Sequence, residues 1–137
     1  KRSILTPHLG ELERLIGKCM DTYERLMKVK ELAAYLQSYI IVKGAWTCIV
    51  TPEGNYYFNP TGNPGMATGG SGDVLTGILL GLLAQGYERE DACRLGVYVH
   101  GLAGNLAAEE KTEIGMTAND IIEALPKAWK TLTTKNR

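Results

Sequence analysis

The sequence predicts a mixed α/β fold in which several helices pack against one sheet. Three observations indicate this: short runs rich in β-branched residues, longer stretches with apolar residues at helical spacing, and an ordinary globular composition. The chain has 137 residues, of which 45% are hydrophobic and 22% charged, enough for one domain with a hydrophobic core. We therefore expect residues 1–137 to form a single domain.

The first half of the chain is expected to hold two helices and a small sheet. Ile4 and Leu5 read as the end of a strand, which Thr6-Pro7 stops. Helices are expected over residues 10–16 and 23–37, the second capped at Asp21-Thr22. Three β-rich runs follow, the last two joined as a hairpin by turn residues, and these strands cover residues 39–42, 47–51 and 56–59.

The second half is expected to be helical, over residues 73–85, 88–110 and 118–132. The first of these helices is apolar all round, as is typical of a helix buried on most sides. Gly77 and Gly81 share one face of it, which suggests close packing against a neighbouring element. Thr117 and Asp120 have the spacing of a helix cap.

Charge and cysteine content exclude several classes of protein. The formal net charge is zero, so nucleic acid and acidic membrane surfaces are not expected partners. Cys19, Cys48 and Cys93 are odd in number and lack CxxC spacing, which argues against a disulfide framework and a structural zinc site. Free thiols of this kind are typical of a reducing compartment, and we expect a cytoplasmic protein. No apolar run reaches transmembrane length.

The segment from Asn59 to Asp73 is the strongest functional signal. Five glycines fall between positions 62 and 72, and an apolar helix follows at once. Glycines let a backbone approach a ligand closely, and a helix start offers unpaired N–H groups at a positive dipole end. This combination predicts an anion site, most often for phosphate. The spacing matches neither a Walker A motif nor a Rossmann fingerprint.

Asp73 does not fit a site that only binds anions. One interpretation is that it caps the helix, since Asp is a favoured N-cap residue. The other is phosphoryl transfer, with Asp73 taking the proton of the attacking hydroxyl. Lys43-Gly44 ends a buried strand, where it either meets a phosphate or is an ordinary turn. His8 and His100 are too few for a metal site; His8 reads as a loop residue and His100 as a structural one.

Five motifs together resemble one family: Leu5-Thr6-Pro7-His8-x-Gly10-Glu11, Val42-Lys43-Gly44-Ala45, Asn59 to Asp73, Val99 to Gly104, and Thr117-Ala118-x-Asp120-Ile121-Ile122. They resemble the ATP- or ADP-dependent NAD(P)H-hydrate dehydratases of the ribokinase-like superfamily. The resemblance runs over almost the whole chain. It implies a ribokinase-like three-layer α/β/α sandwich, of which this sequence is the C-terminal portion.

The resemblance also implies a reaction and a set of site residues. A nucleotide phosphorylates the ring hydroxyl of hydrated NADH or NADPH, and loss of phosphate restores the cofactor. ATP or ADP with Mg²⁺ is expected, although no residue is a secure metal ligand. Asp73 is the expected base, and His8 and Asp73 the expected substrate contacts. The expected nucleotide contacts are Lys43, Gly44, Ala45, Trp46, Thr47, Asn63, Pro64, Gly65, Met66, Ala67, Thr68, Gly69, Gly70, Ser71 and Gly72.

Two other functions stay open at this point. A small-molecule kinase of the same superfamily would use the same loop and Asp73 but stop at the phosphorylated product. A non-catalytic nucleotide-binding module is the third possibility. The family's domain is about twice as long as this chain, so we expect strands and part of the substrate pocket to be missing here. Such a fragment would need homo-oligomerisation or association with the missing N-terminal half.

Overall fold

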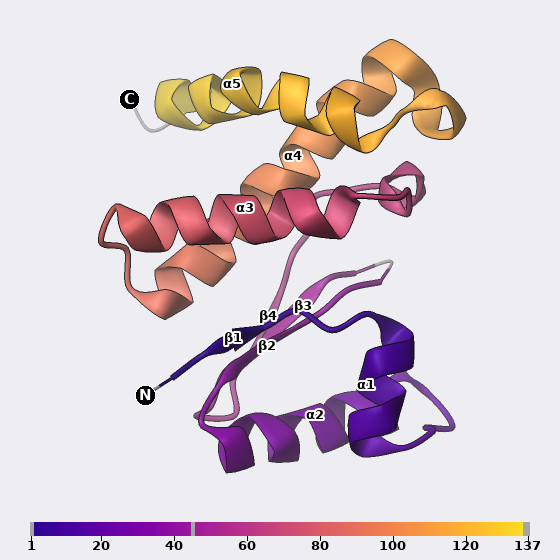
Figure 1. The fold of residues 1–137 in the computed structure, drawn as a ribbon, viewed down its shortest axis with the longest axis vertical. Helices are drawn as coiled ribbons and strands as arrows, with labels where there is room; N and C mark the ends of the chain where they lie inside the picture. The colour runs from indigo at the N-terminus through magenta and orange to yellow at the C-terminus, as the bar shows by residue number, and fades with distance from the viewer. Residues whose placement is uncertain (1, 45, 136–137) are drawn as a thin grey trace. The chain divides into compact units, whose positions relative to one another are not determined.

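The computed structural model describes residues 2–44 and 46–135. Its elements run β1, α1, α2, β2, β3, β4, a 3₁₀ turn, α3, α4 and α5 (Figure 1). The described residues form two compact units, one drawn from residues 2–44, 46–59 and 88–94 and the other from residues 60–87 and 95–135. Each unit has its own helices and hydrophobic side chains.

The first unit is built on a four-stranded sheet in the order β1-β2-β3-β4. β1 runs parallel to β2, with Leu5 opposite Ile40, while the other two pairs are antiparallel. The expected hairpin between the last two strands is confirmed. The strands are β1 (Ile4–Leu5), β2 (Tyr39–Val42), β3 (Cys48–Val50) and β4 (Tyr56–Phe58).

Two helices cover one face of this sheet, α1 (Leu9–Ile16) and α2 (Thr22–Leu36) (Figure 1). Asp21 caps α2 as expected, because its Oδ1 accepts the backbone N–H of Glu24 at 2.8 Å. α1 is capped by His8, whose Nδ1 accepts the Glu11 N–H at 3.2 Å while Glu11 Oε1 accepts the His8 N–H at 2.9 Å. This reciprocal pair is a capping box in which histidine replaces the usual hydroxyl residue.

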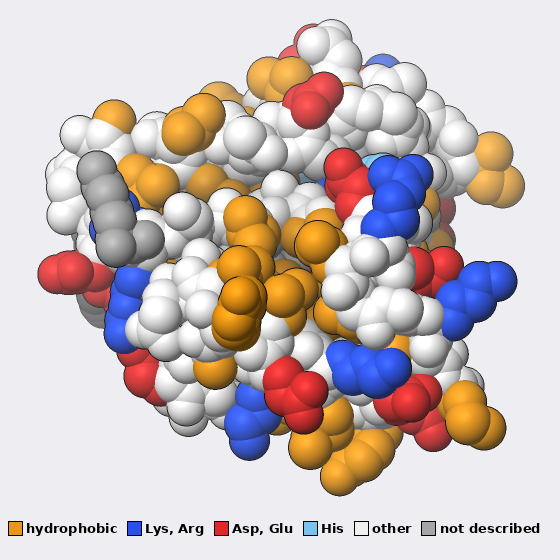
Figure 2. Space-filling model, turned by 60° about the horizontal axis from the view of Figure 1, so that its bottom comes forward, with side chains coloured by type: hydrophobic (Ala, Val, Ile, Leu, Met, Phe, Trp, Pro, Cys, Tyr) orange, Lys and Arg blue, Asp and Glu red, His pale blue; other side chains and the backbone are white. Residues whose placement is uncertain are grey.

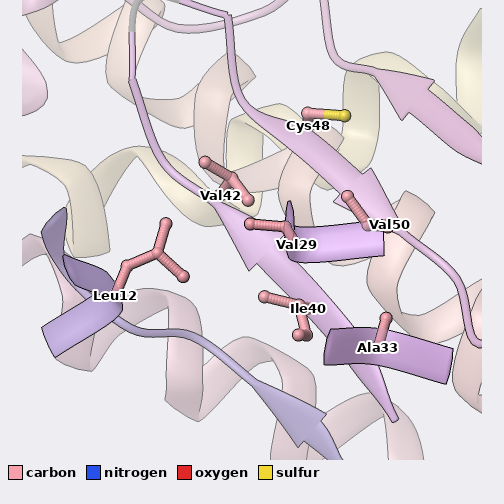
Figure 3. Packing of buried hydrophobic residues seen from close by; sticks show 7 residues of the cluster. All are labelled: Leu12, Val29, Ala33, Ile40, Val42, Cys48 and Val50. Atoms are coloured by element: carbon pink, nitrogen blue, oxygen red, sulfur yellow. The ribbon is translucent and has the colours of Figure 1, made fainter. Parts of the chain in front are cut away.

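The core of the first unit lies between these helices and the sheet. Strand β2 is buried along its whole length, which agrees with its continuous apolar sequence. Arg94, in the first turns of α4 (Arg89–Gly115), also belongs to this unit, and its guanidinium lies 4.1 Å from the centre of the Tyr57 ring. The seven core residues drawn in Figure 3 are Leu12, Val29, Ala33, Ile40, Val42, Cys48 and Val50.

Large hydrophobic side chains also reach the surface of this unit. Met20, Tyr23 and Tyr35 are the most exposed of those in and beside α1 and α2. On the face drawn in Figure 2, hydrophobic side chains lie among charged ones. Exposed apolar residues are normal in a folded protein, so these positions need no separate explanation.

The second unit is helical. After the short 3₁₀ helix η1 (Pro64–Met66) come α3 (Ser71–Ala84), the rest of α4, and α5 (Ala118–Lys135). Thr117 and Asp120 form the expected cap, since Thr117 Oγ1 accepts the Asp120 N–H at 3.3 Å. α4 runs past its expected end to Gly115, although Thr112 breaks its helical geometry with φ 67°. Among the described residues, no helix has both the length and the hydropathy to cross a membrane.

Side chains of α3 contact α4 at a different glycine from those expected. A Cβ at Gly77 or Gly81 would meet no atom within 4 Å, so the prediction that these residues permit close packing is wrong. The close approach occurs at Gly96 of α4, where a Cβ would lie 2.8 Å from Leu79 Cδ2. Gly77 and Gly81 instead line a cavity between α3 and α5.

The loop before α3 rests directly on α4. Thr61 Oγ1 donates to the Tyr98 carbonyl oxygen at 3.0 Å. A Cβ at Gly101 would lie 2.7 Å from the Thr61 carbonyl carbon, and one at Gly104 would lie 2.7 Å from Met66 Cε. These two glycines therefore let the loop lie against the helix backbone.

The described cysteines are all free thiols, as the sequence predicts. Cys48 and Cys93 are buried, and Cys19 is half-buried. Burial raises the pKa of the Cys48 thiol to about 11 and that of Cys93 to about 12 because it disfavours the charged thiolate.

We expect Gly101→Ala to destabilise the protein by roughly 1–3 kcal/mol, because the new methyl group must displace the Thr61 backbone. Gly81→Ala is the matched control in an open helical position, and it should stabilise by roughly 0.5–1 kcal/mol through better helix propensity. Urea unfolding of both variants measures the difference. Equal effects at the two positions would contradict the packing described above.

We expect the free energy of unfolding to fall as the pH rises above about 9. Both buried thiols have a higher pKa in the folded chain than their ordinary value of 9.0, so the unfolded chain loses these protons first. The protonated thiols stabilise the folded chain fully below the unfolded-state pKa of 9.0. This contribution is lost as the pH rises toward the folded-state pKa. Urea titrations from neutral pH to about pH 11 measure it. Cys93→Ala should make the free energy of unfolding fall less steeply with pH. An unchanged slope in this variant would show that the buried thiol is not the cause of the pH dependence.

Candidate functional site

The site is built around the start of α3. Gly70 is the N-cap residue with φ 90°, a left-handed conformation that favours glycine. A Cβ there would also lie 3.1 Å from the Ala118 Cβ. No side chain caps this helix, so its first N–H groups stay open to a ligand.

Backbone N–H groups without a protein acceptor gather at this helix start. Across the part of the chain that the structure describes, no acceptor is found for the N–H groups of Thr68, Gly69, Gly70, Gly72 and Asp73. The Ser71 N–H is already hydrogen-bonded, because it donates to the Thr68 carbonyl oxygen at 3.2 Å. Open amides next to a positive dipole end form an anion site.

In the earlier part of the Gly-rich segment, the backbone amides are bonded within the loop itself. The N–H groups of Gly65, Met66 and Ala67 donate to Asn63 Oδ1, the Asn63 carbonyl and the Pro64 carbonyl at 2.9, 3.1 and 3.1 Å. Asn63 Nδ2 donates to Asn105 Oδ1 of α4 at 3.0 Å. These residues therefore shape the loop, and their amides are not available to a phosphate.

Asp73 is the third residue of α3 and not its cap. The helix begins two residues earlier than expected, at Ser71, so the N-cap interpretation of Asp73 is wrong. Its side chain is exposed and has no hydrogen-bond or ion-pair partner among the described residues. Both carboxylate oxygens of Asp73 are therefore accessible to a ligand at the start of α3.

A cavity of about 930 Å³ lies between α3 and α5, and Gly70 and Asp73 form part of its wall. The rest of the wall is mostly apolar, with Trp129 and Ile122 on α5. Apolar cavities with a few polar groups are the usual form of small-molecule sites. The sequence pattern did not identify the α5 wall, because these residues read as an ordinary helix face.

His100 is buried in α4 and contacts the start of α3. Its Nε2 lies 3.0 Å from the Ser71 carbonyl oxygen and 3.3 Å from Ser71 Oγ. The sequence placed His100 in the middle of a helix with a structural role. It contained no local signal for this contact, because the two residues are 29 positions apart.

The remaining predicted residues lie in the first unit. His8 follows β1 and Lys43 follows β2; because these strands are parallel, the two loops leave the same edge of the sheet. His8 lowers the pKa of Glu11 through its backbone N–H, and the charge of Lys43 adds to this effect. Gly44 has open space around it, and Trp46 is 67% exposed. Thr47 is half-buried, and its carbonyl accepts the Asn59 N–H at 2.8 Å. Ala45 lies outside the described residues.

The described side chains do not form a metal site. Within residues 2–44 and 46–135, no group of three or more His, Cys, Asp or Glu side chains is placed to hold a metal ion. The chemistry that the arrangement supports is binding of a phosphate by main-chain amides next to a carboxylate that can accept a proton.

Comparison with known proteins places this chain in a family. A family model for NAD(P)H-hydrate dehydratase matches residues 1–127. A bifunctional NAD(P)H-hydrate repair enzyme of Thermofilum pendens is 48% identical over 132 residues, which are 95% of this chain and 25% of that protein.

Solved structures similar to this chain include a member of the same family. The crystal structure of the ADP/ATP-dependent NAD(P)H-hydrate dehydratase of Bacillus subtilis, co-crystallised with ATP and Mg²⁺, superposes with a TM-score of 0.84 and 39% identity. A ribokinase-like superfamily protein of Enterococcus faecalis gives a TM-score of 0.76 and 36% identity. Both matches cover 93% of this chain, and 47% and 44% of those chains. The chain thus spans about half the length of these proteins. It has a ribokinase-like α/β fold and belongs to the NAD(P)H-hydrate dehydratase family.

Proposed function

We propose that the protein carrying this chain repairs hydrated NADH or NADPH with ATP or ADP as phosphoryl donor. The ring hydroxyl oxygen attacks the terminal phosphorus of the nucleotide, and the bond from that phosphorus to the leaving nucleotide breaks. Loss of phosphate from the ring, with a proton from the neighbouring carbon, then restores the dihydronicotinamide. The observation that supports this most directly is the partnerless Asp73 carboxylate beside the open amides of α3.

In this proposal Asp73 takes the hydroxyl proton as the bond to phosphorus forms. The amides of Thr68, Gly69, Gly70, Gly72 and Asp73 stabilise the negative charge on the moving phosphoryl group. The segment from Asn63 to Ala67 keeps the loop in shape, because its own amides are already bonded.

The residues of the first unit are assigned by their match to the family motifs. Lys43 to Thr47 would contact the nucleotide, and His8 would contact the hydrated cofactor. His8 and Glu11 are both exposed, so the histidine is accessible despite its capping role. The common edge from which the two loops leave the sheet supports a shared ligand.

Mg²⁺ would enter with the nucleotide, because the described residues do not supply a ligand set of their own. It would neutralise charge on the phosphate oxygens. The B. subtilis relative was co-crystallised with ATP and Mg²⁺, which supports this assignment.

The length of the relatives bears on the assembly. Because the chain spans about half of the B. subtilis structure, we propose that both units belong to one dehydratase domain that is only partly present here. The rest of the substrate site would come from an N-terminal half or from another copy of the chain. The free thiols suit a reducing compartment, and we propose a cytoplasmic protein.

We expect Asp73→Asn to lower turnover by roughly 10²–10⁴-fold, the usual contribution of a general base. Nucleotide binding should persist, because the amides are unchanged and a negative charge is removed. Recovery of the absorbance of the reduced cofactor measures turnover, and calorimetric titration measures nucleotide binding.

Asp120→Asn is the matched control, since Asp120 is also the third residue of a helix in the same unit. This variant loses part of a cap but should keep its turnover. Absence of any turnover in the intact wild-type protein with either nucleotide would reject the proposed function. A stable phosphorylated product would instead identify a small-molecule kinase.

A further inference from the structure

The start of α3 lacks the side-chain cap that the structure gives to other helices. Gly70 is its N-cap residue, and Gly69 and Gly72 flank it. Glycines have the largest backbone freedom of any residue type, so the residues next to Asp73 do little by themselves to fix its backbone. A phosphoryl-transfer site needs the opposite, because its donors and base must be fixed before reaction.

His100, on α4, forms a hydrogen bond that fixes the start of α3. Since the Ser71 carbonyl can only accept, the His100 Nε2 must carry a proton and donate to it, at 3.0 Å. Ser71 Oγ lies 3.3 Å from the same nitrogen. Ser71 is the first residue of α3 and is 6% exposed, and His100 is 9% exposed. Burial protects this bond from competition by water.

The same stretch of α4 also holds the loop before α3. Thr61 donates to the Tyr98 carbonyl, and Asn63 donates to Asn105. His100 lies between Tyr98 and Asn105 on this helix, so one rigid element contacts both the loop and the first turn of α3. Gly101 and Gly104 allow the loop to lie against that element.

We propose that His100 is a positioning residue for phosphoryl transfer. It fixes Ser71, and through Ser71 it aligns the amides of Gly72 and Asp73 with the Asp73 carboxylate. It does not touch the substrate or take part in proton transfer. The inference rests on the proposed function and assigns to His100 the control of geometry at that site.

Two variants in the intact protein test this role. His100→Phe keeps a planar ring of similar size but removes the donor. It should lower kcat roughly 10- to 100-fold, because small displacements of catalytic groups have effects of this size. KM for the nucleotide should change much less, since the amides of Thr68 and Gly69, which precede α3, keep their places in the loop. His100→Gln keeps an amide donor and should recover a substantial part of kcat.

Val99→Ala is the control for a general loss of stability. Val99 is the preceding residue of α4 and lies in the core of the second unit. This variant should lower Tm while leaving kcat and KM unchanged. If His100→Phe also lowers Tm but keeps the wild-type kcat, the residue is only structural and the inference is wrong.

Hydrogen exchange separates this inference from the proposed function. Mass spectrometry of peptides that cover residues 69–76 should show faster exchange in His100→Phe than in the wild type or in Val99→Ala. A wild-type protein without turnover rejects the proposed function, and exchange then still decides whether His100 fixes the helix start. Unchanged exchange in His100→Phe overturns the inference in either case.

Discussion

The rest of the site depends on a helix that begins without a side-chain cap. α1, α2 and α5 each use a side chain, from His8, Asp21 and Thr117, to occupy an N–H of the first turn. α3 begins instead at Gly70 in a left-handed conformation, with its first amides open. An uncapped helix start is less stable than a capped one, but it leaves donors and a dipole directed at whatever binds there.

An uncapped start has to be held by its surroundings, and α4 does this in the second unit. Gly96 lets α3 approach α4 closely, Gly101 and Gly104 let the preceding loop lie on the helix, and His100 bonds the first residue of α3. α3 thus presents the open amides and the Asp73 carboxylate, while α4 contacts both the preceding loop and the first residue of α3.

The first unit holds its predicted contact residues through its sheet topology. β1 and β2 are parallel neighbours, which places the His8 and Lys43 loops at one edge of the sheet. The core behind that edge is made by two helices and the buried strands β2 and β3 (Figure 3). The family match covers both units, since the model for NAD(P)H-hydrate dehydratase matches residues 1–127.

Local sequence patterns determined which elements form and which family the chain resembles. β-branched runs marked the strands, Asp21 and Thr117-Asp120 marked helix starts, and the glycines before Asp73 marked the uncapped start of α3, because each signal acts within a few residues. The tertiary structure decided the rest. In the structure, α3 begins at Ser71, and the amides of Gly65 to Ala67 are hydrogen-bonded within their own turn. Gly77 and Gly81 line a cavity. The tertiary structure also brought His100 to Ser71 across 29 positions. Such contacts depend on how whole helices pack, and no local pattern encodes that packing.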